Sequence, residues 1–240
     1  MDTQQPDHRR PGTVLVTGGA SGLGAAVVAA VVRAGGRALV LDLEPPDDVD
    51  GTKVEHVRVD LADPRAAERA VQDLVDATGG VLDGVLTAAG TDRCGTLADV
   101  DGAAWDRVVQ VNLLGTAAVV RAALPYLEQR HGTVVTVAST LGLKAVSDAT
   151  AYCASKFGVV GFTRALAAET RGRVGVTLLV PGGMHTAFFD DRDERYKPPA
   201  DAKLNRPEDT AAAVLFVFSQ PPGCEVRELV VASSEEGSWP

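Results

Sequence analysis

A tyrosine and a lysine four positions apart, Tyr152 and Lys156, stand in the stretch AYCASKFG (151–158). On a helix such residues share a face, with their Cβ atoms about 5–6 Å apart. A lysine ammonium there favours the phenolate of tyrosine, whose ordinary pKa of about 10 is too high for a base at neutral pH. The spacing therefore predicts a general acid/base whose pKa is lowered by its neighbour. Taken alone, the pair is more often an ordinary half-buried helix face.

The elements that must position this pair alternate along the chain as short apolar runs and longer helix-like segments. Alternation with strands that are apolar throughout predicts a parallel sheet buried on both faces. The expected strands are 13–18, 37–42, 53–60, 83–90, 132–139, 173–182 and 227–233. The expected helices are 22–35, 64–79, 105–129, 150–170 and 206–219. We therefore expect an α/β fold, a doubly wound, seven-stranded parallel sheet with helices on both faces.

Length and composition favour one acidic domain. The chain has 240 residues, 45% of them hydrophobic, and a formal net charge of -9. The length and the hydrophobic content are enough to bury a core. The negative net charge speaks against nucleic acid or an anionic membrane as a partner. The polar residues 1–12 predict a flexible tail before a single domain at 13–240. The irregular stretch at about 184–206 predicts a lid.

Cysteine and histidine usage adds two expectations. The three cysteines are scattered, which favours a reducing cytoplasm over a disulfide framework. The four histidines have no metal-ligand spacing, so we expect no metal site. The longest apolar runs, such as 25–32 and 211–218, are too short to span a bilayer.

A glycine-rich turn, TGGASGLG (17–24), joins the first expected strand to the first expected helix. Glycines let a backbone approach a pyrophosphate, and the N–H groups at the start of the next helix attract the anion. The position after the first strand favours this interpretation over an ordinary loop. The turn predicts a dinucleotide site made by Gly18, Ser21, Gly22, Leu23 and Gly24.

Asp42 ends the second expected strand, 18 residues after Gly24. A carboxylate there can accept hydrogen bonds from both adenosine ribose hydroxyls and repels a 2′-phosphate. Neither Ser21 nor the neighbouring Leu43 is basic, so no cation stands ready for such a phosphate. The sequence thus favours NAD over NADP.

Asp60 ends the third expected strand, and we expect its side chain and the Leu61 backbone to contact the adenine. The alternative is that an aspartate here only caps the helix that starts at Pro64. Asp63 fits that cap better, which leaves Asp60 for the ligand.

Ser139 ends the fifth expected strand, and Tyr152 and Lys156 follow on the next helix. Ligands of open α/β sheets bind beyond the carboxyl ends of the strands, so all three fall at the expected edge. The Ser139 hydroxyl can bond the substrate oxygen that Tyr152 meets. Leu141 and Phe188 are candidates for contact with an apolar substrate.

The glycine turn, the serine after the fifth strand and the Y-x-x-x-K pair, in this order, resemble the short-chain dehydrogenase/reductase family in its compact, single-domain branch. The resemblance covers essentially the whole chain after the tail and implies a Rossmann-like fold. It also implies an NAD(H)-dependent oxidoreductase that interconverts a secondary alcohol and a ketone by hydride transfer. By the family pattern, Tyr152 is the general acid/base, Lys156 holds the nicotinamide ribose and lowers the tyrosine pKa, and Ser139 positions the substrate oxygen. Asn112 matches the asparagine that holds a water in the proton relay.

The resemblance extends to two further backbone segments around the cofactor, and it has two departures. It implies contacts from Ala88, Ala89 and Gly90 after the fourth strand, and from Pro181, Gly182, Met184 and Thr186 beside the nicotinamide. The fourth strand ends T-A-A-G where the family has N-N-A-G, so the asparagine that ties this strand is absent at Ala88. The chain ends SEEGSWP, without the glycine-rich final turn of relatives.

The resemblance implies a homotetramer or homodimer that packs through the helices at 105–129 and 150–170. Two alternatives for function remain open. One is an NADPH-dependent 3-oxoacyl-thioester reductase, which Asp42 disfavours. The other is a catalytically silent dinucleotide-binding sensor or scaffold, which the complete catalytic set disfavours. A small, apolar alcohol or ketone is the expected substrate.

Overall fold

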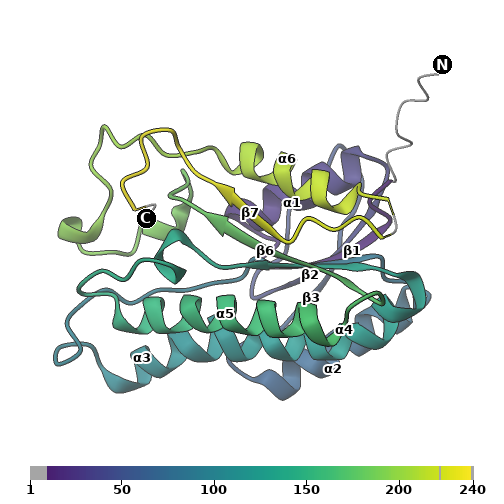
Figure 1. The fold of residues 1–240 in the computed structure, drawn as a ribbon, viewed down its shortest axis with the longest axis horizontal. Helices are drawn as coiled ribbons and strands as arrows, with labels where there is room; N and C mark the ends of the chain where they lie inside the picture. Colours follow the sequence, from purple (N-terminus) through teal and green to yellow (C-terminus); the bar gives the residue numbers. More distant parts are fainter. Residues whose placement is uncertain (1–9, 222, 239–240) are drawn as a thin grey trace.

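The computed structural model describes residues 10–221 and 223–238, and this part forms one seven-stranded parallel sheet with helices on both faces (Figure 1). Most of the predicted tail, residues 1–9, lies outside the described residues. The strands are β1 (Thr13–Thr17), β2 (Arg37–Asp42), β3 (Glu55–Arg58), β4 (Gly84–Thr87), β5 (Thr133–Val137), β6 (Gly175–Pro181) and β7 (Glu228–Val231). The predicted fold class is confirmed.

The strand order is β3-β2-β1-β4-β5-β6-β7, so the chain reverses direction across the sheet between β1 and β4. In open α/β sheets this switch point leaves a crevice beyond the carboxyl ends of the two strands. The strand register places Thr17, at the end of β1, beside Thr87, at the end of β4. The predicted glycine turn therefore starts at the crevice.

Helices on the two faces bury three apolar clusters among the described residues, one under α1 and α6 and two on the opposite face. The longer helices are α1 (Gly22–Arg33), α2 (Pro64–Ala77), α3 (Gly102–Val109), α4 (Thr116–Arg130), α5 (Thr150–Glu169) and α6 (Pro207–Phe218). In Figure 1, α1 and α6 cover one face, while α2, α4 and α5 cover the other. Because the central strands β1, β4, β5 and β6 pack on both sides, their residues are mostly apolar and buried, whereas the edge strands β3 and β7 include exposed charged residues.

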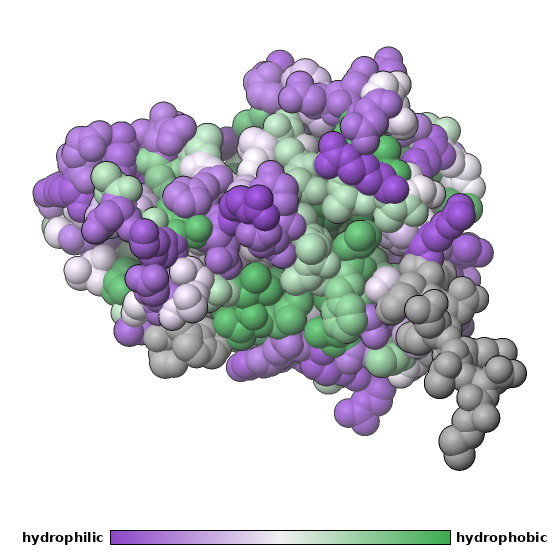
Figure 2. Space-filling view, turned by 90° about the horizontal axis from the view of Figure 1, so that it is seen from above, coloured by the Kyte–Doolittle hydropathy of each residue, from purple (hydrophilic) through white to green (hydrophobic). Residues whose placement is uncertain are grey.

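The surface seen in Figure 2, on the side of α1 and α6, is mostly polar but includes a connected apolar area. One large apolar side chain of this side is well exposed, Phe216 of α6 (51%). Val230 of β7 (42%) is also exposed, but its neighbours Leu229 and Val231 pack into the cluster on the α1 and α6 side, so its side chain faces the other side of the sheet. On the opposite helix layer, Leu114 and Phe157 are exposed by 47% and 44%. The described part of the chain thus carries exposed apolar residues on both helix layers.

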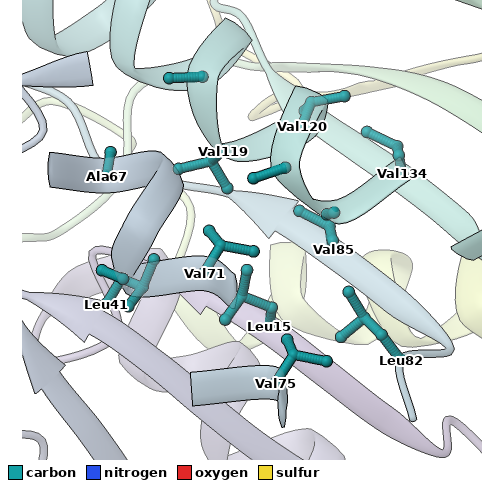
Figure 3. Close-up of a cluster of buried hydrophobic side chains, with 14 of the residues drawn as sticks. Leu15, Leu41, Ala67, Val71, Val75, Leu82, Val85, Val119, Val120 and Val134 are labelled. Carbon is teal, nitrogen blue, oxygen red and sulfur yellow. The ribbon is translucent and has the colours of Figure 1, made fainter. Parts of the chain in front are cut away.

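The cluster under α2 and α4 is drawn in Figure 3, where Leu15 of β1 and Val85 of β4 face Val71 of α2 and Val119 of α4. All four side chains are fully buried. Burying such a side chain contributes about 1.5–3 kcal/mol. This packing fixes the strand ends on which the site is built.

The single helix expected at 105–129 is a continuous helical run from Gly102 to Arg130 with a π-helical turn, η1 (Gln110–Gly115), in its middle. Here Gly115 lies so close to the Leu61 carbonyl that a Cβ would come within 2.8 Å of the oxygen. By length and hydropathy alone this run is compatible with a membrane span, but 56% of its most apolar window is buried inside the fold. We read it as a core helix whose π-turn places Asn112.

The irregular stretch expected near 184–206 is closed at its base. Asn205 donates its N–H to the Gly183 carbonyl (3.1 Å) and accepts from the N–H of His185 (2.9 Å). Two short 3₁₀ turns, η3 (Ala187–Phe189) and η4 (Glu194–Tyr196), lie between these ends. We call residues 184–205 the lid loop. Figure 1 places this loop and the C-terminal segment at the same end of the molecule.

Candidate active site

A cavity of about 730 Å³ opens beyond the carboxyl ends of the strands, a size typical of ligand pockets. All the residues predicted to contact a cofactor or substrate line it. They are Gly18, Ser21, Gly22, Leu23, Gly24, Asp42, Leu43, Asp60, Leu61, Ala88, Ala89, Gly90, Ser139, Leu141, Tyr152, Lys156, Pro181, Gly182, Met184, Thr186 and Phe188. Asn112 alone among the predicted residues lies behind the wall, although Val111 lines it.

Tyr152 and Lys156 share one face of α5, as their spacing predicts. The Lys156 ammonium lies 5.6 Å from the centre of the Tyr152 ring and donates to the Val137 carbonyl at the end of β5 (2.9 Å). Ser139 begins the 3₁₀ turn η2 (Thr140–Gly142) and accepts from the Leu141 N–H (3.1 Å). The three catalytic candidates therefore meet where β5 ends.

The predicted lowering of the Tyr152 pKa is wrong for this structure. Burial raises the pKa of Tyr152 to about 12, and the Ser139 hydroxyl acts against this rise. Burial also lowers the pKa of Lys156 to about 8, with the Asp92 charge opposing that shift. The spacing predicts the proximity correctly, but the main cause of the pKa shift is desolvation, which spacing cannot reveal.

Asn112 is buried and fully engaged. Its amide oxygen accepts from the Thr91 N–H (2.8 Å), and its amide nitrogen donates to the Thr91 carbonyl (2.9 Å) and the Ser155 hydroxyl (3.0 Å). These bonds tie the loop after β4 to α5. The relay role stays a prediction, while the structural role of the side chain is evident from its contacts.

The end of β4 is held even though Ala88 lacks the family's amide. The Thr17 hydroxyl accepts from the Ala89 N–H (3.1 Å), and Asn112 holds Thr91 just beyond it. The local rigidity that the missing asparagine called into question is therefore supplied by a threonine at the end of β1 and by the π-turn.

The glycines of the first turn are required by close backbone contacts. Gly18 has φ of +71°, and a Cβ there would come within 2.8 Å of the Ala89 backbone. A Cβ at Gly24 would lie 2.0 Å from the Gly18 carbonyl oxygen. Ser21, at the N-cap of α1, makes no side-chain capping bond. The turn is thus tight, and its serine hydroxyl is left available at the start of the helix.

Asp42 links the end of β2 to this turn. One carboxylate oxygen accepts from the Ala20 N–H (2.9 Å) and the other from the Glu44 N–H (3.2 Å). The carboxylate is thereby fixed at the cavity wall, where Leu43 is 41% exposed. Its contact with a ribose stays a prediction.

Asp60 is not left for a ligand as expected. Arg107 of α3 donates to both of its oxygens (3.0 and 3.3 Å), and the Ala62 N–H donates to one of them (2.9 Å). The prediction missed the pair because Arg107 is 47 positions away. Asp63 does cap α2, as predicted, through the N–H groups of Arg65 and Ala66.

The lid loop covers the catalytic end of the cavity. The Phe188 ring lies 5.8 Å from the Tyr152 ring, and the Phe189 ring stands edge-on 5.6 Å from Phe188. Arg192 also lines the cavity and is paired with Asp92, which follows β4 (2.7 Å). No local pattern links positions 100 residues apart, so this pair could not be predicted from the sequence.

The C-terminal segment forms another part of the wall. The Glu236 carboxylate accepts from the Gly183 N–H (2.9 Å) and from the Ser238 hydroxyl (2.8 Å). The Ser238 hydroxyl also lies 2.6 Å from that of Thr140, next to Ser139. The unusual ending SEEGSWP was the available signal, but it did not reveal where the segment packs.

Comparison with known proteins settles the family. The family model of short chain dehydrogenases matches residues 12–197. The chain belongs to this family. It is 32% identical to 2-(S)-hydroxypropyl-CoM dehydrogenase 3 of Xanthobacter autotrophicus over 230 residues, covering 86% of this chain and 89% of the relative. It is 33% identical to D-threitol dehydrogenase of Mycolicibacterium smegmatis over 230 residues, covering 89% and 88%. This short-chain dehydrogenase is therefore an oxidoreductase of alcohols and ketones.

Solved structures agree with this placement. A putative NAD(P)-dependent gluconate 5-dehydrogenase from Beutenbergia cavernae, with bound NADP, superposes with a TM-score of 0.77 at 30% identity, covering 91% of this chain and 94% of that one. An alcohol dehydrogenase from Thermococcus sibiricus, complexed with 5-hydroxy-NADP, shares the fold with a TM-score of 0.83 at 21% identity, covering 94% and 97%. The family uses NAD or NADP, and these neighbours leave the choice between the two open.

Proposed function

We propose that this short-chain dehydrogenase uses NAD(H) to interconvert a neutral secondary alcohol and its ketone. The observation that carries the proposal is the convergence of Ser139, Tyr152 and Lys156 at one end of a cavity whose other end holds Asp42. Tyr152 would accept the proton beside a nicotinamide bound in this cavity, which would accept the hydride. Oxidation of an alcohol requires both.

The cavity residues fit a dinucleotide. The tight turn at Gly18 and Gly24 would bring backbone N–H groups to the pyrophosphate, Asp42 would meet the ribose hydroxyls, and Lys156 would hold the nicotinamide ribose. Bound NAD⁺ supplies the acceptor for the hydride that leaves the carbinol carbon. Every other step falls to side chains of this chain.

Tyr152 takes the proton of the alcohol in oxidation and returns it in reduction. Ser139 holds the same oxygen and fixes its direction towards the phenol. The pKa of about 12 that burial imposes on Tyr152 has to fall during turnover, and positive charge beside the ring acts in that direction. Two cations are placed to act in this way: the Lys156 ammonium, 5.6 Å from the ring centre, and Arg192, whose charge lowers the Tyr152 pKa.

The preference for NAD rests on Asp42. Its fixed carboxylate would repel a 2′-phosphate, and the nearest cavity-lining cation at that end, Arg107, is already bound to Asp60.

The proposal of a neutral substrate rests on the cations around the cavity. Three line it: Arg107, Lys156 and Arg192. Arg107 is paired with Asp60 and Arg192 with Asp92, and Lys156 is taken by the nicotinamide ribose in the proposed complex. No cation of the described cavity wall is thus available for a substrate anion, while Leu141 and Phe188 offer apolar contact.

We further propose a cytoplasmic homotetramer. Exposed apolar residues in two separate regions, Leu114 with Phe157 on one helix layer and Phe216 on the other, would suit the two kinds of contact that a tetramer with dihedral symmetry needs. The three unpaired cysteines suit a reducing compartment. Light scattering at micromolar concentration tests the assembly, and a monomer would refute it.

The function is tested with a panel of neutral secondary alcohols and ketones, followed by cofactor absorbance with NAD(H) and NADP(H) in parallel. We expect turnover with NAD(H) and much weaker turnover with NADP(H). Tight NADH binding without turnover on the whole panel would favour the sensor alternative. A clear NADPH preference would overturn the assignment of Asp42.

A further inference from the structure

One ion pair stands apart from the others in the described residues. Arg192 of the lid loop contacts Asp92, which lies 100 positions earlier, after β4, at 2.7 Å. Their side chains are only 18% and 6% exposed, and no other ion pair of the described chain has both partners below a fifth. Removing two charges from water is costly, so a pair buried to this extent is weak evidence of a purely stabilising role.

Arg192 connects this pair to the catalytic tyrosine. Its guanidinium carbon lies 5.2 Å from the Phe188 ring centre and 4.6 Å from that of Phe189, and its Nη1 donates to the Tyr196 carbonyl (3.4 Å). Phe188 in turn lies 5.8 Å from the Tyr152 ring. A continuous series of contacts thus runs from the loop after β4, through the lid loop, to the acid/base.

Asp92 is anchored without its partner. Its carboxylate accepts from the Arg93 N–H (2.7 Å) and from the Cys94 thiol (3.3 Å). These partners belong to the loop of Asp92 itself, and this loop is tied to the helix layer at the preceding residue, where Asn112 bonds the Thr91 backbone. Arg192 is the part that the lid loop brings to it.

We propose that Asp92 and Arg192 form a latch that fixes the lid loop over Tyr152 and cancels a negative charge next to the acid/base. Both are positioning residues. The inference rests on the proposed dehydrogenase function and adds to it the element that holds the substrate end of the cavity closed.

The charge part follows from the groups that face Tyr152. These are Ser139 after β5, Lys156 and Cys153 of α5, Asp92 after β4 and Arg192 of the lid loop. The Asp92 charge opposes the phenolate, whereas the Arg192 charge favours it. A docked lid loop therefore both shields Tyr152 and removes an obstacle to its ionisation.

The test compares R192Q, R192K, D92N and the double variant D92N/R192Q, with R195Q as a matched control. Arg195 belongs to the same lid loop and pairs with Asp193 at 3.8 Å, but these side chains are 69% and 62% exposed. We expect R192Q to lower kcat/KM for alcohol oxidation by about tenfold or more, since it leaves a buried carboxylate without its cation. R192K should recover part of this loss, and R195Q should stay within about twofold of the wild type.

The pH profile separates the two parts of the latch. Oxidation needs the phenolate, so its rate rises with pH through the Tyr152 pKa. In R192Q the unpaired Asp92 raises that pKa, so the rising limb of the pH–rate profile moves to higher pH. D92N/R192Q should return this limb to the wild-type position, because the Asp92 charge is gone. Its KM should stay above that of the wild type, because the lid loop is no longer held by the ion pair.

Hydrogen exchange of peptides from 184–205 gives a readout that needs no activity. We expect faster exchange in R192Q and D92N/R192Q than in the wild type or R195Q. The latch would be overturned if R192Q had the same KM, pH profile and exchange rate as the wild type. It would also be overturned if R195Q changed these quantities as much as R192Q does. If the wild type turned over no substrate, the proposed function would fail, and exchange alone would still decide the latch.

Discussion

The two ends of the cavity are built in different ways. The cofactor end consists of strand ends and one glycine turn, in which Gly18, Gly24 and Ala89 touch through their backbones. The substrate end is assembled from side chains of four segments: the loop after β4, η2, the lid loop and the C-terminal segment. Arg192 and Asp92 are 100 positions apart, and Thr140 and Ser238 are 98 apart.

Because of this difference, the two ends of the cavity tolerate substitutions to different degrees. Backbone contacts at van der Waals distance tolerate almost no substitution, so the cofactor end is fixed by steric exclusion. Hydrogen bonds between side chains can be replaced one at a time. The substrate end can therefore vary between relatives that share one cofactor site, as dehydrogenases with names as different as D-threitol and 2-(S)-hydroxypropyl-CoM suggest.

The largest effect is expected where the two ends meet, at Tyr152. Tyr152→Phe should lower kcat by about 10²–10⁴-fold, which is the usual contribution of a positioned acid/base. NADH binding, measured by fluorescence, should change little because only one hydroxyl is lost. Unaltered turnover of an accepted alcohol would contradict the role given to Tyr152.

At the cofactor end, Gly24→Ala adds only one methyl group, but we expect a large effect on both stability and cofactor binding. The new Cβ would lie 2.0 Å from the Gly18 carbonyl oxygen, so the turn must shift. We expect a loss of about 1–3 kcal/mol in the free energy of unfolding and a marked loss of NADH affinity. Urea denaturation and fluorescence titration measure the two.

The matched control is Gly102→Ala, at the exposed start of α3, where a Cβ would meet nothing within 4 Å. Its stability should stay within about 0.5 kcal/mol of the wild type. If Gly24→Ala behaved like this control, the steric account of the cofactor end would be wrong.

At the substrate end, Glu236→Gln should have a milder and more selective effect. The glutamine cannot accept with both oxygens from Gly183 and Ser238, so the C-terminal wall loosens. We expect KM for the alcohol to rise by about fivefold, equivalent to one weakened charged hydrogen bond, with NADH affinity unchanged. Glu235→Gln, on the exposed neighbour, should leave both constants unaltered, and equal effects of the two variants would argue against the wall.

The smallest effect concerns stability and pH. Burial lowers the pKa of Lys156 from 10.5 to about 8, so between these values the unfolded chain binds more protons than the folded one. The contribution of Lys156 to stability therefore rises with pH across that window and is complete above it. Lys156→Met should flatten the increase in urea midpoint with pH, and an unaltered slope would show that the lysine is not desolvated.

The same contrast explains what could be predicted from the sequence. The strands, the glycine turn and the Tyr152–Lys156 face depend on local patterns, and the structure reproduces them. The binding of Asp60 by Arg107, the sign of the Tyr152 pKa shift and the pairing of Asp92 with Arg192 depend on contacts between distant segments or on burial. No local pattern reports either.

Direct hydride transfer is the central claim, and an isotope experiment tests it without relying on rates. A secondary alcohol deuterated at its carbinol carbon is incubated with NAD⁺ and the wild-type enzyme, and the reduced cofactor is analysed by mass spectrometry. We predict that the NADH carries the deuterium and that Tyr152→Phe forms almost none. Reduced cofactor without the label, or equal labelled product from Tyr152→Phe, would contradict the account.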